Sequence, residues 1–147
     1  MSSRADKAKE LFEQGYNCAQ ATLGAFFDIS GLDYDTAMKL SSSFGGGMGK
    51  LREVCGAVSA MFMMAGILKG YSTAETGEIK ANHYKLIQDL AQKFREENGS
   101  IICRELLNLQ EKEKSFVPSE RTEEYYKARP CSMLVYSAAK IIEEELL

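Results

Sequence analysis

The sequence predicts an all-α fold, a single helical bundle of about six or seven helices that spans residues 1–147. The two prolines are Pro118 and Pro130, so residues 1–117 contain none, and interior proline breaks helices. No stretch alternates apolar and polar residues with β-branched enrichment, so no strand is predicted. A chain of 147 residues has the length of one domain.

Composition excludes several classes of protein. The net charge is −3, which gives no electrostatic reason to bind nucleic acid or an anionic membrane. Hydrophobic residues make up 45% and charged residues 27%, which is typical of a soluble globular domain. The first ten residues lack the apolar core of a secretory signal, and the uncharged run of residues 54–68 is too short to span a bilayer. We therefore expect a cytoplasmic protein without nucleic-acid or membrane partners.

Three helices are predicted before the first glycine cluster. Residues 3–14 carry apolar side chains at helical spacing, and Gly15 ends that segment. Asn17 is a good N-cap for a second helix to about Phe27. Asp33 or Asp35 can cap a third helix over residues 34–43, and the glycine-rich residues 45–49 should form a loop.

The second part of the chain predicts three longer helices and one short one. An apolar helix covers residues 53–69, and an amphipathic helix runs from Thr73 to about residue 97. Ser100 caps a short helix through residue 109, and the charged residues 111–122 form a surface loop. A final helix covers residues 130–145, with Pro130 suited to its first turn.

The cysteines all fall in the first turn of a predicted helix. Free backbone N–H groups and the positive end of the helix dipole stabilise a thiolate at that position. Basic residues adjoin three of the cysteines and should lower their pKa further: Lys50 and Arg52, Arg104, and Arg129. The sulfurs continue the apolar stripes, so the helix starts could converge on one site. The four cysteines are Cys18, Cys55, Cys103 and Cys131.

A Cys-x-x-Cys pair is absent from the sequence, which removes the thioredoxin motif and the usual zinc-ribbon knuckle. Cys55 is expected to be the most activated thiol, since Lys50, Arg52 and the glycine stretch lie close before it. The alternative is that the cysteines fill space in the core, as buried cysteine often does.

The glycine stretch permits two interpretations. It lacks the spacing of a phosphate-binding P-loop, and no strand precedes it as a dinucleotide fingerprint requires. It is either a turn with unusual backbone angles or a cofactor-binding segment whose amides approach a thiolate, a cluster or a small anion. The residues concerned are Gly45, Gly46, Gly47 and Gly49.

His83 is the single histidine, and it lies on the apolar stripe of the amphipathic helix. This position favours a satisfied core histidine over a base or a ligand.

These residues together resemble the redox-active protein family named for its C_GCAxxG_C_C cysteine pattern. The resemblance covers most of the chain: the segment around Cys18, the glycine stretch, Cys55-Gly-Ala57, the segment from Asn98 to Leu107, and Cys131 with the helix after it. The chain departs from the pattern at Ala60, which stands where the last glycine of the motif belongs. The resemblance implies a small redox-active protein with the four cysteines as working residues, and it supplies no substrate.

Three functions remain open on the sequence. Thiol–disulfide or electron-transfer chemistry would use the four cysteines with a redox partner or a small-molecule oxidant. Alternatively, the same cysteines could bind zinc or an iron–sulfur cluster. The third function is a helical interaction module with buried structural cysteines. The apolar helix over residues 53–69 serves a core or a homodimer interface equally well.

Overall fold

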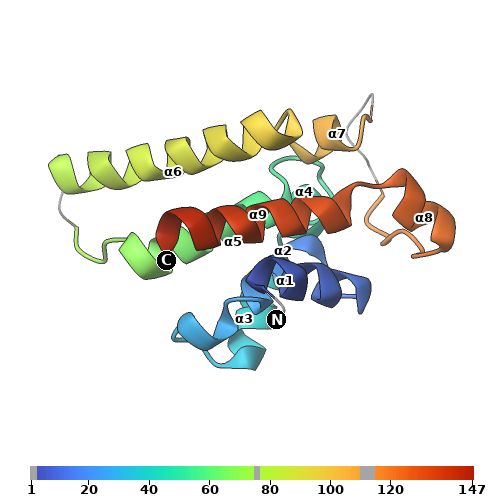
Figure 1. Ribbon diagram of the computed structural model, residues 1–147, viewed down its shortest axis with the longest axis horizontal. Helices are drawn as coiled ribbons and strands as arrows, with labels where there is room; N and C mark the ends of the chain where they lie inside the picture. Colours follow the sequence, from blue (N-terminus) through green and yellow to red (C-terminus); the bar gives the residue numbers. More distant parts are fainter. Residues whose placement is uncertain (1–2, 75–76, 110–114) are drawn as a thin grey trace.

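The computed structural model describes residues 3–74, 77–109 and 115–147, and within them the chain is all α (Figure 1). The described residues contain six helices of seven or more residues and three shorter helices, which confirms the predicted fold class. No described helix is long and apolar enough to cross a membrane. The longer helices are α1 (Arg4–Glu13), α2 (Cys18–Gly24), α3 (Tyr34–Ser42), α5 (Gly56–Lys69), α6 (Glu78–Asn98) and α9 (Cys131–Leu146). The shorter ones are α4 (Gly45–Met48), α7 (Cys103–Leu106) and α8 (Glu123–Ala128), with a 3₁₀ turn at Phe27–Ile29.

Side-chain caps start the first helices where the sequence predicts. Ser3 and Asn17 each form a capping box, with Asp6 and Gln20 respectively. Asp33 accepts a hydrogen bond from the amide of Thr36 and so caps α3. Each cap satisfies N–H groups that the first helical turn leaves without a partner.

The core lies where α1, α2, α5 and α9 pack against one another. Helix α9 contacts α1, α2, α5 and α6, and α6 lies along α5 and α9 on one side of the molecule (Figure 1). The apolar helix α5 buries most of its side chains, which is why its sequence is nearly uncharged. Its fully buried members include Val58, Met61 and Met64.

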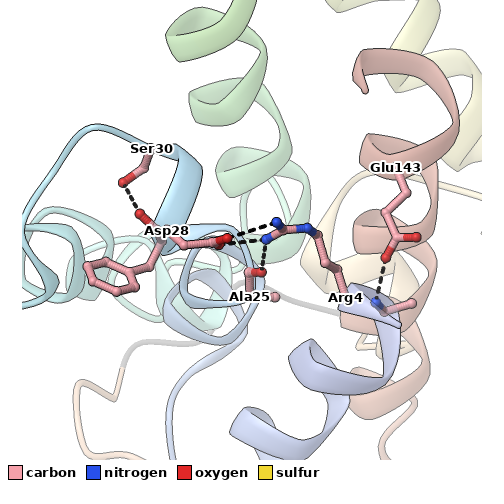
Figure 2. A network of polar contacts seen from close by, with 7 residues as sticks. Arg4, Ala25, Asp28, Ser30 and Glu143 are labelled. Atoms are coloured by element: carbon pink, nitrogen blue, oxygen red, sulfur yellow. Dashed lines mark hydrogen bonds and ion pairs between the residues drawn. The ribbon is translucent and has the colours of Figure 1, made fainter. Parts of the chain in front are cut away.

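A polar network ties the two ends of the chain together (Figure 2). The guanidinium of Arg4 makes two hydrogen bonds to the carboxylate of Asp28, at 2.7 and 2.9 Å, and one to the carbonyl of Ala25. The Glu143 carboxylate accepts a hydrogen bond from the amide of Ala5 at 3.0 Å. The network therefore fixes the start of α1 against the last turns of α9.

Several helix boundaries differ from the predictions. Helix α2 ends at Gly24 rather than near Phe27, where a 3₁₀ turn begins instead. Helix α6 begins at Glu78 after Gly77, so Thr73 does not open it. The helix predicted after Ser100 is one turn, α7. The predicted loop over residues 111–122 lies partly outside the described residues, and helix α8 just after it was not predicted.

Candidate functional site

All four cysteines stand at helix starts, as predicted. Cys18, Cys103 and Cys131 are the first residues of α2, α7 and α9, and Cys55 immediately precedes α5. All four line a single cavity of about 60 Å³. Cysteines separated by 37, 48 and 28 residues in sequence therefore meet at one place in the fold.

Backbone pairing places Cys55 beside Cys103. Val54 and Ile102, the residues directly before the two cysteines, form an isolated antiparallel bridge. The amide of Cys55 donates to the carbonyl of Ile101 at 2.8 Å, and the amide of Cys103 donates to the carbonyl of Glu53 at 2.6 Å. This pairing anchors the starts of α5 and α7 to each other.

A close approach of two helices places Cys18 beside Cys55. A Cβ atom at Gly56 would lie 2.5 Å from the Cys18 sulfur and 2.7 Å from the carbonyl oxygen of Phe44. Glycine at this position therefore leaves the space that the Cys18 sulfur fills. The need for glycine directly after Cys55 follows from the packing of α2 on α5.

The glycine stretch is a left-handed turn rather than an irregular loop. Residues Gly46 to Lys50 all have positive φ, between 61° and 72°. Left-handed backbone costs about 1–2 kcal/mol for each residue other than glycine, so three glycines among five residues keep that cost low. The predicted turn with unusual backbone angles is therefore present.

The same turn packs directly against the site. A Cβ atom at Gly47 would lie 2.5 Å from the Cys103 Cβ and 2.9 Å from the Arg52 Cα. The amides of residues 48–53 donate to carbonyls within residues 44–48, so these N–H groups serve the turn itself. Cofactor binding by Gly45, Gly46, Gly47 and Gly49 stays a prediction, although Gly46 lines the cysteine cavity.

Three arginines also line the cysteine cavity, and each is held in place. Arg52 is 4% exposed and donates from Nη1 to the Cys103 sulfur at 3.6 Å. The guanidinium of Arg121 lies 4.1 Å above the Phe12 ring and donates to the carbonyls of Phe12 and Tyr16. The third, Arg129, lies 5.3 Å from the centroid of the Tyr125 ring.

Burial dominates the ionisation of the thiols, which corrects a prediction. The pKa of Cys55 is well above its ordinary value, because burial disfavours the thiolate and the neighbouring Cys18 adds repulsion. Burial also raises the pKa of Cys103, and the hydrogen bond that Arg52 donates to its sulfur opposes this rise. Burial raises the pKa of Cys131 to about 12. Cys55 is therefore not the activated thiol that its helix start and neighbouring cations predicted.

His83 lies away from the cysteine cavity and is half-buried. Its ring meets that of Tyr71 edge-on at 5.7 Å, and its Nδ1 is buried without a hydrogen-bond partner in the described residues. The prediction of a satisfied core histidine is therefore wrong. The N-terminal part of α6 stands further from the core than its apolar stripe predicted, as Ile79 is 48% exposed.

The four cysteines carry the donor atoms of a common type of metal site. Four thiols are the ligands that zinc and two-iron clusters prefer. Within the described residues, however, no group of three or more His, Cys, Asp or Glu side chains is arranged to hold a metal ion. The described residues therefore contain no formed metal site, and metal binding by these cysteines stays a prediction.

Sequence reasoning missed part of the site. Arg121 and Tyr125 lie after Pro118 in a charged segment with no motif. Arg121 reaches the cavity through its contact with Phe12 of α1, and Tyr125 lies next to Arg121. No local signal in the sequence marks them. Conversely, Arg104 adjoins Cys103 in sequence but does not line the cavity.

The fold and the site define a small all-α protein with four clustered thiols. The family model described as "Putative redox-active protein (C_GCAxxG_C_C)" matches residues 16–145, and the chain belongs to this family. At the position where the chain departs from the family pattern, the methyl group of Ala60 is fully buried within the core. Comparisons with curated proteins and with solved structures gave no match.

Proposed function

We propose that the protein carries out thiol–disulfide redox chemistry in which Cys18 and Cys55 cycle between a dithiol and a disulfide. One observation carries the proposal: cysteines from four separate helix starts line the same small cavity. Cysteines that only fill space in a core are not expected to come from four elements and line one cavity together with three arginines.

The choice of this pair rests on contacts and exposure. The Cys18 sulfur occupies the space beside Gly56, next in sequence to Cys55. Among charged neighbours, Cys18 has the strongest effect on the ionisation of Cys55. Cys18 is half-buried, whereas Cys55 is 4% exposed. Of this pair, Cys18 is the thiol that an incoming molecule meets first, and Cys55 is the resolving thiol behind it.

The reaction follows from this order and balances. The Cys18 thiol gives its proton to the solvent, and the resulting thiolate attacks one sulfur of a substrate disulfide. A mixed disulfide forms, and the first substrate thiolate leaves and takes up a proton from the solvent. Cys55 then attacks the Cys18 sulfur, gives its proton to the departing sulfur and releases the second. Two electrons pass from the two cysteines to the substrate, which leaves as two thiols.

Cys103 and Cys131 supply a second pair of thiols to the same cavity. Burial is the main cause of the raised pKa of both, and a smaller contribution from Cys18 supports their closeness to it. A thiol attack by either one on the Cys18 sulfur would return Cys55 to the reduced form. A reducing compartment such as the cytoplasm would supply electrons for the next cycle.

Oxidation of variants by hydroxyethyl disulfide tests the proposal. Remaining thiols are trapped with N-ethylmaleimide, and peptides are mapped by mass spectrometry. The wild type should form a disulfide between Cys18 and Cys55, Cys18→Ser should not, and the matched variant Cys103→Ser should retain it. Four alkylated thiols in the oxidised wild type, or equal disulfide formation in Cys18→Ser, would refute the proposal.

A further inference from the structure

The cysteine cavity adjoins a second, larger hollow. The inner cavity has a volume of about 60 Å³, and the outer hollow about 290 Å³. The N-cap of α2, the left-handed turn with the arginine that follows it, and the segment around α8 line both. The shared lining is Asn17, Gly46, Arg52, Arg121, Tyr125 and Arg129.

The inner cavity and the outer hollow differ in volume, so each suits a different part of a ligand. Ligand pockets usually measure about 300–1,000 Å³, so the outer hollow can hold the body of a small molecule. The inner cavity has room for a few atoms, which suits the reacting end of that molecule. A substrate that reaches the cysteines must therefore be small and slender, with its remaining groups in the outer hollow.

The described residues that line the outer hollow carry charge of one sign. Its cationic lining comprises Lys50, Arg52, Arg121 and Arg129. None of the described residues that line either space is Asp or Glu. The chain as a whole carries a net charge of −3, so this concentration of positive charge is local. Low-dielectric walls around such a cluster focus its field on an anionic ligand.

The cations are held in position rather than gathered by chance on a mobile surface. Arg121 is fixed by its contacts with Phe12 and by its hydrogen bond to the Tyr16 carbonyl at 2.8 Å. Lys50 belongs to the left-handed turn and donates to the carbonyl of Val117. Fixed cations need little reorganisation when an anion binds.

We propose that the substrate of this site is a small disulfide that bears carboxylates, with the carboxylates in the outer hollow and the disulfide in the inner cavity. This inference rests on the proposed function. Reduction of one such disulfide by Cys18 and Cys55 yields two carboxylate-bearing thiols and one protein disulfide, so the electrons and the two thiol protons balance.

Three reagents of similar size and different charge test the inference. Dithiodipropionate carries two negative charges, hydroxyethyl disulfide is neutral, and cystamine carries two positive charges. Each rate of protein oxidation is divided by the rate of the same reagent with a free cysteine derivative, which removes differences in intrinsic reactivity. At low ionic strength the anionic reagent should react at least about tenfold faster than the cationic one, and salt should reduce that ratio.

Matched variants locate the effect. Lys50→Gln and Arg129→Gln should each lower the ratio several-fold. Lys85→Gln, which removes the same charge from an exposed position on α6, should leave the ratio unchanged. Equal corrected rates for the three reagents would overturn the substrate class and leave the redox function intact.

A binding readout separates the two claims. Adipate has two carboxylates and no disulfide, so ligand-observed NMR reports on the outer hollow without any redox step. Adipate binding that is present in the wild type and weaker in Lys50→Gln supports an anion site. If no reagent oxidises the protein, that lack of oxidation refutes the redox function and leaves the anion site intact. Absence of adipate binding would overturn the anion site, just as equal rates would overturn the substrate class.

Discussion

The guanidinium of Arg52 lies 3.6 Å from the sulfur of Cys103, and both residues are buried, at 4% and 7% exposure. Burial raises the pKa of Cys103, and the hydrogen bond and positive charge of Arg52 act against that rise. Arg52 reaches this position from a backbone with φ of 62°, just after the left-handed turn. The turn therefore places a cation where the fold buries a thiol.

Replacing Arg52 should make Cys103 less reactive. Arg52→Gln removes the cation that favours the thiolate, so the pKa of Cys103 should rise. Each unit of increase lowers the alkylation rate of Cys103 near neutral pH about tenfold. Iodoacetamide labelling of Cys103 against pH, read by peptide mass spectrometry, measures the change.

Two further variants control this experiment. Arg52→Lys keeps the charge and should restore part of the reactivity. Arg104→Gln removes the cation adjacent to Cys103 in sequence, and it should leave the pKa of Cys103 unchanged because Arg104 does not line the cavity. An equal loss of Cys103 reactivity in Arg52→Gln and Arg104→Gln would contradict the claim that the buried contact of Arg52 with the sulfur lowers the pKa of Cys103.

A methyl group at Gly56 should displace the Cys18 thiol. The added Cβ would lie 2.5 Å from the Cys18 sulfur, so Gly56→Ala should slow disulfide formation and cost about 1–3 kcal/mol of unfolding free energy. Gly66→Ala on the same helix meets nothing within 4 Å and should be neutral or stabilise by about 0.5–1 kcal/mol. Urea unfolding and thiol-oxidation rates measure both effects, and the account fails if the two variants behave alike.

The left-handed turn should tolerate alanine at one glycine and not at another. Gly49 has φ of 61° and its nearest added contact is 3.7 Å, so Gly49→Ala should cost about 1–2 kcal/mol from handedness alone. Gly47→Ala adds a clash with Cys103 at 2.5 Å, which should cost about 1–3 kcal/mol more. Gly47→Ala should also lower the alkylation rate of Cys103. Equal destabilisation of the two variants in urea would contradict this packing.

The reduced protein should lose stability in alkali. The pKa of Cys131 rises from an ordinary 9.0 to about 12, so the folded state holds this proton more tightly than the unfolded chain. The resulting stability is complete below pH 9 and is lost as the pH rises towards 12, by about 1.4 kcal/mol per pH unit. Urea unfolding of wild type and Cys131→Ala across this range measures the slope. A slope that is the same in both would contradict the burial of this thiol.

The sequence could predict the helix starts because caps and turn residues act locally. Asn17 and Pro130 begin helices as their chemistry requires, and this places Cys18 and Cys131 at helix starts. The ionisation of Cys55 could not be predicted, because burial depends on how α2, α5 and α7 meet. The position of Arg121 in the cavity could not be predicted either, because its contacts with Phe12 and Tyr16 join residues more than one hundred positions apart in the sequence.

The central claim is that the four cysteines form one site of cycling thiols. Native mass spectrometry tests it most directly, on protein purified without air and without chelator, before and after one equivalent of hydroxyethyl disulfide. The account predicts the mass of the reduced chain, followed by a loss of about two daltons without a bound adduct, because one disulfide removes two hydrogens. A mass increase that matches zinc or iron with sulfide in the first spectrum, or a stable adduct with no such loss in the second, would contradict it.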